Sequence, residues 1–350
     1  MAPTDYGTPA SLRQEIRNAV STRAALLVIG VLAIQIAFIA SYIGAFHSPK
    51  PDRIAIAVVA PAQAAAQAEQ TAKKLDGLPG GPLDPRTLPN EATAVRQIEN
   101  RDIDAALLID PRGSTDRLLV AGGGGASLSQ AVELVVSKAE KAEKRAVKVI
   151  DIAPSDRGDS RGLSSFYLVV GWCVGGYLCA AALAISAGAR PANANRALIR
   201  LAVLALYSIV AGLLGTIVAG PVLDALPGSL FGLWGLGALL VFAVGATTLA
   251  LQGLAGTMGI GLAILIIVVF GNPSAGGAYP YPLLPPFWQA IGPALPPGAG
   301  TWAARSIADF HGNAGTGPLL VLSAWAVAGT VLTLALAAVR NGGARRPLPE

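Results

Sequence analysis

The stretch that decides the fold is ALPGSLFGLWGLGALLVFAVGATTLALQGLAGTMGIGLAILIIVVF, residues 225–270. It contains no Asp, Glu, Lys or Arg, and the charge-free region continues to Ala304. Soluble domains carry roughly 25% charged residues, so a stretch of this length without any would not remain dissolved. About 20 apolar residues in a helix cross the hydrocarbon core of a bilayer. The stretch therefore predicts at least two membrane-spanning helices.

Charge is scarce over the whole chain and unevenly distributed. The 350 residues are 53% hydrophobic and 13% charged, with a mean hydropathy of +0.55. Residues 47–163 hold 16 Lys and Arg and 16 Asp and Glu, most of the charged side chains in the chain. This composition excludes an ordinary cytosolic enzyme. It predicts a polytopic α-helical membrane protein with one water-exposed domain.

Six apolar segments have, or nearly have, the length of a membrane span. The first is longer than the apolar part of a signal peptide, which is about 7–15 residues, so we expect it to remain as a helix. The fifth is short and rich in glycine. A charged residue at a span centre costs about 2.5–3.5 kcal/mol, and none of the segments contains one. We therefore expect six transmembrane helices, at residues 25–46, 165–187, 201–222, 230–251, 254–271 and 318–339.

The basic residues of the short connections predict the orientation, because Lys and Arg accumulate on the cytoplasmic side. The opposite connections, 223–229 and 272–317, contain only Arg305. We therefore expect a plasma-membrane protein with both termini cytoplasmic and residues 47–163 outside. These arginines also explain the pI of 9.4 without a nucleic-acid partner. The nine that agree are Arg13, Arg17, Arg23, Arg190, Arg196, Arg200, Arg340, Arg345 and Arg346.

Strands and helices alternate in the outside segment, which predicts an α/β domain with a parallel or mixed sheet. The Pro- and Gly-rich stretch GLPGGPLDPRTLP, residues 77–89, is expected to break the chain between helices. Strands are expected at 53–60, 104–109, 117–120 and 147–152, and helices at 63–75, 90–100 and 127–146. The expected parts of the chain are a cytoplasmic amphipathic segment 1–24, the first helix 25–46, the extracytoplasmic α/β domain 47–163, a five-helix transmembrane domain 164–340 and a cytoplasmic tail 341–350.

No group of residues points to catalysis or to a bound cofactor or metal. Cys173 and Cys179 lie in one apolar run and are interpreted as buried hydrophobic residues. Gly122–Gly125 lacks the following Lys-Ser/Thr of a phosphate loop and is expected to be a flexible turn. Asp224 and Asp309 are expected to be solvated in the connections, so an intramembrane enzyme is disfavoured. We expect a chain that is not an enzyme.

The N-terminal segment Ser11–Arg23 is interpreted in one of two ways. Its apolar residues recur at helical spacing, and Ser11 with Gln14 has the spacing of a capping box. It is either a basic amphipathic helix in the membrane interface or a positively charged tail without fixed structure. The apolar residues are Leu12, Ile16, Ala19 and Val20.

The last connection, residues 272–317, combines many prolines and glycines with Tyr and Trp. Short helices are expected at 286–291 and near 301–310. Aromatic residues of this kind prefer the membrane–water interface, and irregular backbone at membrane depth requires cover by protein or a water-lined cavity. The connection is therefore either re-entrant or a loop on the surface.

Small residues allow membrane helices to approach closely. Gly171 and Gly175 form a GxxxG motif, and Gly176 adjoins it. These glycines are candidates for helix packing, either within one chain or between two chains.

Three segments together resemble the permeases of the type-2 ABC exporter superfamily, in the branch that includes the phage-infection protein family. The layout of one span, an outside α/β domain and five further spans is similar over nearly the whole chain. The segments are ATAVRQIENRDIDAALLIDP (92–111), VKVIDIAPSDRGDSRGLSSFYLVVGWCVGGYL (147–178) and the stretch from GNPSAGG to FHGN (271–313).

The resemblance implies a permease that is driven by a separate cytoplasmic ATP-binding subunit and that works as a homodimer or heterodimer. It implies that Ser11–Arg23 and Gly188–Arg200 contact this subunit. The contacting residues would be Arg13, Arg17, Arg190 and Arg196.

Two functions follow from these observations. The first is export of a lipophilic or amphipathic substrate, because the spans contain no charges and membrane lipid surrounds them. The alternative is a membrane-anchored extracytoplasmic binding or surface protein without transport, in which the spans only hold the α/β domain.

Overall fold

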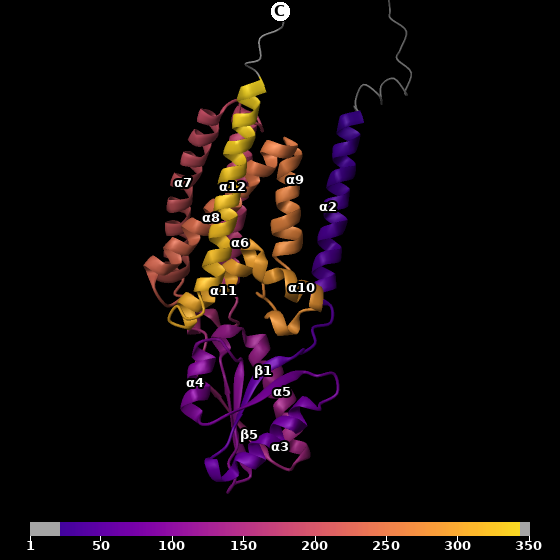
Figure 1. Ribbon diagram of the computed structural model, residues 1–350, viewed down its shortest axis with the longest axis vertical. Helices are drawn as coiled ribbons and strands as arrows, with labels where there is room; N and C mark the ends of the chain where they lie inside the picture. The colour runs from indigo at the N-terminus through magenta and orange to yellow at the C-terminus, as the bar shows by residue number, and fades with distance from the viewer. Residues whose placement is uncertain (1–21, 344–350) are drawn as a thin grey trace, which may run out of the picture.

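Five apolar segments form helices that are long and apolar enough to cross a membrane. They belong to the part of the chain that the structure, a computed structural model, describes, residues 22–343. The spans lie side by side, with a small α/β domain at one end of the bundle (Figure 1). A multi-pass membrane protein is thus confirmed. The five helices are α2 (Thr22–Phe46), α6 (Ser164–Ala187), α7 (Ala194–Ile217), α8 (Leu230–Ala255) and α12 (Thr316–Gly343).

The fifth predicted span, residues 254–271, is shorter and less regular than the others. The chain turns at Gly256, where φ is 64°. It then forms α9 (Met258–Ile264), which continues as the π-helical turn η5 (Leu265–Gly271). Fourteen residues at 1.5 Å each reach about 21 Å, less than the ~30 Å of hydrocarbon in a bilayer. The sixth full-length span is therefore not confirmed.

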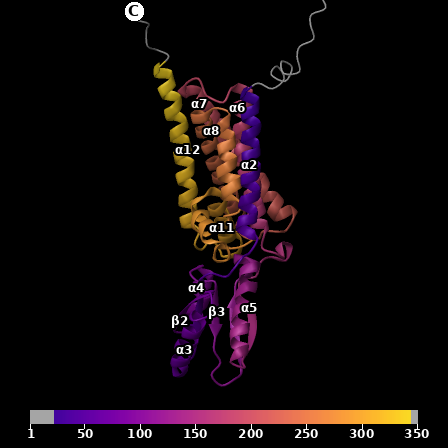
Figure 2. The same cartoon turned by 90° about the vertical axis from the view of Figure 1, so that its right-hand side faces the viewer.

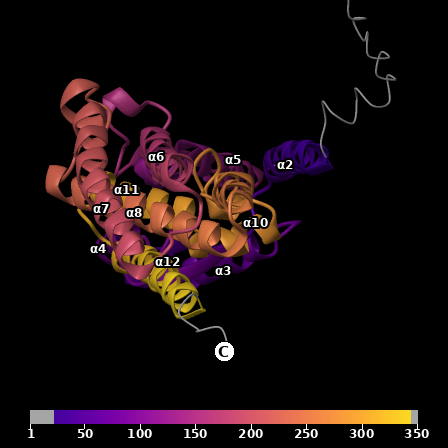
Figure 3. The same ribbon diagram turned by 90° about the horizontal axis from the view of Figure 1, so that it is seen from above.

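Helix α8 is central in the bundle, and α2 stands apart from it (Figure 3). Over its most apolar 18-residue window, α8 is 56% buried inside the protein, whereas α2 is 6% buried. Helix α8 packs against α6, α7 and α12, and α2 touches mainly η5. A mostly apolar surface of α2, which also carries the exposed Gln35, therefore faces away from the protein.

The described chain ends, at Thr22 and Gly343, lie at the end of the bundle opposite the α/β domain (Figures 1 and 2). Arginines at this end donate hydrogen bonds to carbonyl oxygens at the C-termini of α6 and α8, where the helix dipole favours a cation. The bonds run from Arg190 to Leu254, from Arg200 to Ala187 and Gly188, and from Arg340 to Gly253.

The α/β domain contains a five-stranded mixed sheet in the order β2-β1-β3-β4-β5. Strands β3 and β4 are antiparallel, and the other neighbours are parallel. The predicted mixed sheet is confirmed. The strands are β1 (Ile54–Val59), β2 (Leu83–Leu88), β3 (Ala105–Leu108), β4 (Thr115–Val120) and β5 (Ala146–Asp151).

Strand β2 corrects one expectation. Residues 77–89 were expected only to interrupt the chain, but their second half pairs in parallel with β1, Leu83 opposite Ile54. Pro85 is tolerated in β2 because β2 is an edge strand with a neighbour on one side only. Proline has no N–H to donate, and this loss is harmful mainly in a strand that pairs on both sides. The high content of Pro and Gly concealed this strand.

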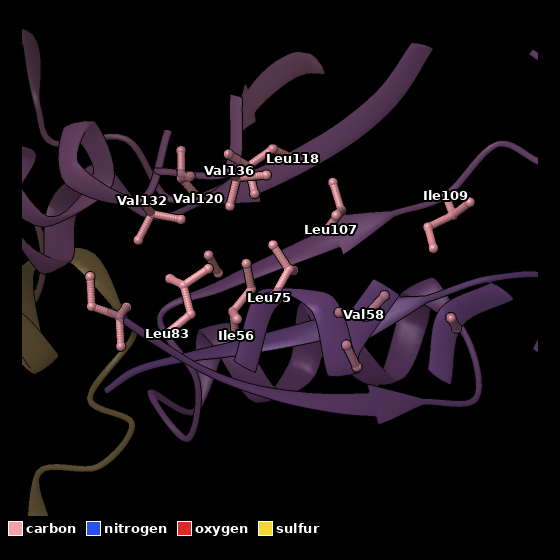
Figure 4. Packing of buried hydrophobic residues seen from close by; sticks show 14 of the residues in the cluster. Ile56, Val58, Leu75, Leu83, Leu107, Ile109, Leu118, Val120, Val132 and Val136 are labelled. Atoms are coloured by element: carbon pink, nitrogen blue, oxygen red, sulfur yellow. The ribbon is translucent and has the colours of Figure 1, made fainter. Parts of the chain in front are cut away.

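Helices cover both faces of the sheet. Helices α3 (Ala65–Asp76) and α5 (Ala126–Ala142) pack on one face, where their Leu75 and Val132 belong to the same apolar core as Ile56 of β1 (Figure 4). Helix α4 (Glu91–Glu99) covers the other face. The Asn90 side chain caps α4, as expected, by accepting a hydrogen bond of 2.8 Å from the Thr93 N–H.

Residues 272–317 lie between the bundle and the α/β domain (Figures 1 and 2). They contain α10 (Pro286–Ile291) and α11 (Pro296–Asp309), each with proline in its first turn, where no N–H is needed. The two expected short helices are confirmed, although α11 begins earlier than expected. Ten of its fourteen residues are buried, and it packs against α6, α8 and α12. Helix α11 is thus an interior element and not a surface loop.

Candidate functional site

The α/β domain and residues 272–317 share their apolar cores. Leu283 packs into the core under α3 and α5, and Phe310 packs into the core on the α4 face. Both side chains are nearly inaccessible to solvent. Each face of the sheet therefore packs against a large apolar residue from a segment more than a hundred residues further along the chain. We call the contact region between the α/β domain and residues 272–317 the junction, and it is the candidate functional site.

Buried polar side chains occupy the same junction. Arg101 follows α4, Tyr281 begins the short helical turn η6 (Tyr281–Leu283), and Arg305 is on α11. All three line a cavity of about 40 Å³.

Arg305 is 3% exposed and holds three segments together. Its guanidinium donates to the carbonyl oxygens of Gly276 at 2.7 Å, Gly277 at 2.8 Å and Gly162 at 3.1 Å. Gly162 immediately precedes α6, so the bonds tie α11 to the start of a membrane helix. Burial lowers the pKa of Arg305. In residues 22–343 no carboxylate lies within ion-pair distance of this guanidinium, and its hydrogen bonds go to carbonyl oxygens.

Arg101 connects the α/β domain to α11. Its Nη1 donates to the Trp302 carbonyl oxygen and to Ser306 Oγ, both at 2.9 Å. Its guanidinium carbon lies 3.6 Å from the centroid of the Trp302 ring and 4.9 Å from that of Phe310, within the range of cation–π attraction. Burial, and secondarily the charge of Arg305, lower the pKa of Arg101 to about 9.

The backbone at Arg101 is strained. Its φ of 60° lies in the left-handed region, which costs energy for a residue with a side chain. The position directly follows α4, where glycine or asparagine is usual. The contacts of the guanidinium across the junction offset this cost.

Acidic side chains surround Arg305 without pairing with it. Asp159 caps α6 by accepting hydrogen bonds from the N–H groups of Leu163 and Ser164 at 2.9 and 3.1 Å. Burial raises the pKa of Asp309 to about 7, although the charge of Arg305 opposes the shift. The expectation that Asp309 is solvated is therefore wrong. Its location on α11 under the α/β domain leaves it only partly accessible to solvent.

Gly122–Gly125 is a site of close approach rather than only a flexible turn. A Cβ on Gly123 would lie 2.5 Å from the Asp309 Cβ, and one on Gly125 would lie 2.5 Å from Pro280. Gly125 also has a φ of 134°, which disfavours any other residue. The glycine run therefore lets the α/β domain dock on α11.

The three candidate packing glycines have different surroundings in the structure. A Cβ on Gly176 would lie 2.7 Å from the Val241 carbonyl oxygen of α8, so this glycine is a helix-packing residue within the chain. At Gly175 only the Tyr207 hydroxyl lies near, at 3.0 Å, and at Gly171 a Cβ would meet nothing within 4 Å. Of the GxxxG pair, Gly175 faces the end of the Tyr207 side chain on α7, and Gly171 contacts no other helix of the described chain.

Of the four arginines expected to contact an ATP-binding subunit, the structure describes two, Arg190 and Arg196. Arg13 and Arg17 lie outside the described residues. Arg190 is exposed and bound to the Leu254 carbonyl oxygen at 3.0 Å. Arg196 is exposed in the first turn of α7, where its N–H is capped by Asn193.

Neither a protein-family model nor a curated protein matches this chain. What the junction does must therefore follow from its own residues. The described residues contain no group of three or more His, Cys, Asp or Glu side chains placed to hold a metal ion. The geometry provides a mechanical link between the α/β domain and the membrane helices, built on two buried cations.

The raised pKa of Asp309 predicts that stability falls as pH rises. Its pKa in the folded protein, about 7, lies above the ordinary value of 3.8, so folding favours the protonated carboxyl. This contribution is fully present below about pH 4 and is lost as pH rises through about 7. Asp309→Asn, which stays neutral, should raise the melting temperature by several degrees at pH 8 and by much less at pH 5.

Thermal unfolding in detergent at the two pH values measures this effect. Asp76→Asn, at an exposed position on α3, is the matched control and should show no such gain at pH 8. An equal effect of Asp309→Asn at pH 5 and pH 8 would contradict the assignment.

Proposed function

We propose that this chain is a permease-like subunit of an export system, which moves a lipophilic or amphipathic substrate with energy from a separate ATP-binding subunit. The observation that carries the proposal is the shared core of the junction. A binding domain that is merely anchored needs only a tether, whereas Leu283 and Phe310 complete the two faces of this α/β domain. Such a connection transmits movement between the domain and the helices.

Polar contacts reinforce the connection at several points along the junction. The Asn313 side chain donates to the Glu99 carbonyl oxygen at 3.1 Å, and Ser127 Oγ donates to that of Ala278 at 3.0 Å. The bonds of Arg101 and of Glu99 lie on the α4 face of the sheet, and the bond of Ser127 lies on the α5 face. They support movement of the α/β domain and α11 as one body.

The surface of the bundle offers openings suited to an apolar substrate. A groove of about 500 Å³ runs between α6 and α7, and its lining includes Trp172, Tyr207 and Leu214. A second crevice of about 520 Å³ separates the start of α2 from the region of Met258. Both openings are lined mainly by apolar surface, which supports a substrate that enters from the lipid.

The orientation is part of the proposal: both termini cytoplasmic, the α/β domain outside the plasma membrane. It is supported by the position of Arg190, Arg196, Arg200 and Arg340 at the bundle end far from the α/β domain, because basic residues accumulate on the cytoplasmic side. The exposed Arg196 and the connection 188–193 offer a surface there for an ATP-binding subunit. The contact with an ATP-binding subunit and the pairing of two permease chains are proposed from the resemblance to type-2 ABC exporter permeases.

One observation favours the alternative, a membrane-anchored binding protein. A groove of about 650 Å³ lies in the α/β domain between α3 and α5, far from the bundle. Polar side chains line it, and an ion pair of 3.0 Å between Lys74 and Glu143 crosses from one helix to the other. A ligand could bind here without any role for the membrane helices.

Purification of the tagged full-length chain from its own membrane tests the two functions. For a permease we expect a copurifying protein with ATPase activity. Deletion of residues 1–23 should abolish its capture, and Arg196→Glu should weaken it about tenfold, the effect of ~1.4 kcal/mol at an interface. The exposed Arg112 in the α/β domain provides the control, since Arg112→Glu should retain full capture. Absence of any ATPase, or equal capture by all variants, would favour the anchored binding protein.

A further inference from the structure

The junction holds two positive charges without an ion-pair partner in the described chain, Arg305 buried and Arg101 partly buried. Arg101 and Arg305 line one cavity, and in residues 22–343 no carboxylate lies within 4 Å of either guanidinium. Uncompensated charge in a protein interior is expensive, and buried charges are normally paired. The carbonyl oxygens around Arg305 solvate its charge but do not neutralise it.

Two polar atoms of the same cavity lining have no hydrogen-bond partner. They are the Tyr281 hydroxyl and Nε of Arg305, and both are buried. The Tyr281 ring is fixed by stacking on Trp302, with 5.8 Å between ring centroids and 11° between ring planes. An unpaired buried polar group costs about 1–3 kcal/mol. Orphaned donors at a cavity indicate that something fills it.

The chemistry of the lining selects an anion. Guanidinium groups only donate hydrogen bonds, and a tyrosine hydroxyl can donate one. Among the lining residues, two arginines stand against one acidic residue, Asp104, while Asp159 and Asp309 act on Arg305 from outside the lining. A single monovalent anion would accept hydrogen bonds from all three donors.

The size of the cavity restricts the anion further. About 40 Å³ is room for roughly three water molecules. A lipid headgroup with its linkage does not fit in this space. We propose that the cavity binds one small monovalent anion, chloride under cellular conditions, between Arg101, Arg305 and the Tyr281 hydroxyl.

The bound anion stabilises the junction, because its ligands come from both sides of it. Arg101 belongs to the α/β domain, whereas Tyr281 and Arg305 belong to residues 272–317. The site is independent of the proposed transport function, and an anchored binding protein would contain it equally.

Thermal unfolding of the full-length chain in detergent tests the site. The protein is compared in sodium chloride, sodium bromide and sodium gluconate at equal ionic strength, because gluconate is too large for the cavity. We expect the melting temperature to be about 2–4 °C higher in chloride or bromide than in gluconate, since a ligand bound only by the folded state stabilises it.

Tyr281→Phe removes the hydroxyl and keeps the ring, so it should lose most of the chloride-dependent rise. Tyr279→Phe is the control at a neighbouring tyrosine outside the cavity lining and should keep the rise. Crystals of the unaltered protein grown in bromide should show an anomalous peak between the two guanidinium groups, which does not depend on any variant. Equal melting temperatures in all three salts, with only water in the cavity, would overturn the proposal.

Discussion

Replacement of Arg305 by methionine should lower the free energy of unfolding by about 3–5 kcal/mol. The substitution leaves three buried carbonyl oxygens, those of Gly162, Gly276 and Gly277, without their donor, and each such loss costs about 1–3 kcal/mol. Methionine fills a similar volume, so little of the effect would come from a cavity. Denaturant unfolding in detergent measures the change.

The variant should also loosen the junction itself. The bond to Gly162 joins α11 to the start of α6, so we expect faster proteolytic cleavage in the connection before α6. Arg305→Lys keeps the charge but cannot fork across three acceptors, and it should recover only part of the stability. Arg117→Met is the control, because Arg117 is half-exposed and bound only to Glu91, a pair worth at most about 1 kcal/mol. Equal losses for Arg305→Met and Arg117→Met would refute the structural role of Arg305.

The sequence predicted the elements that depend on local pattern. Apolar length identified α2, α6, α7, α8 and α12 as spans because burial in lipid is a property of each segment. The capping residue Asn90 and the apolar spacing behind it located α4. Their boundaries shifted where a local signal was overlooked: α7 begins at Ala194, seven residues before the predicted span, because the Asn193 side chain caps it.

The elements that were missed depend on partners far away in the chain. Strand β2 resembles a loop by composition and becomes a strand only because β1 offers its edge. The fifth span is interrupted at Gly256, whose left-handed backbone ends α8. Apolar composition alone cannot distinguish such a turn from a continuous helix.

The junction site was not predicted, because Arg101 and Arg305 are about two hundred residues apart and lie together only after folding. One signal could have located it. Arg305 was the lone basic residue in connections expected to be free of them, within the apolar and aromatic segment 272–317. A single charge in such surroundings requires buried acceptors, and the glycine carbonyls near Gly276 supply them.

Gly176→Ala should destabilise the protein by about 1–3 kcal/mol, whereas Gly171→Ala should change its stability by less than about 0.5 kcal/mol. A Cβ at position 176 would lie 2.7 Å from the Val241 carbonyl oxygen and 3.1 Å from the Val244 Cβ. Because backbone atoms of α8 cannot move without shifting the centre of the bundle, the added methyl group overpacks the interface. At Gly171 the methyl group would enter open space and so cost little.

Substitutions at Gly171 and Gly176 can distinguish packing within one chain from pairing between two chains. Gly171 and Gly175 line the groove between α6 and α7, where a helix of a second chain could approach closely. If two chains pair there, Gly171→Leu should convert a dimer into a monomer in detergent without lowering the melting temperature of the monomer, whereas Gly176→Ala should lower that temperature and leave the dimer intact. Light scattering coupled to size-exclusion chromatography, together with thermal unfolding, measures both quantities. An unchanged mass for Gly171→Leu would show that this groove is not the contact between two copies.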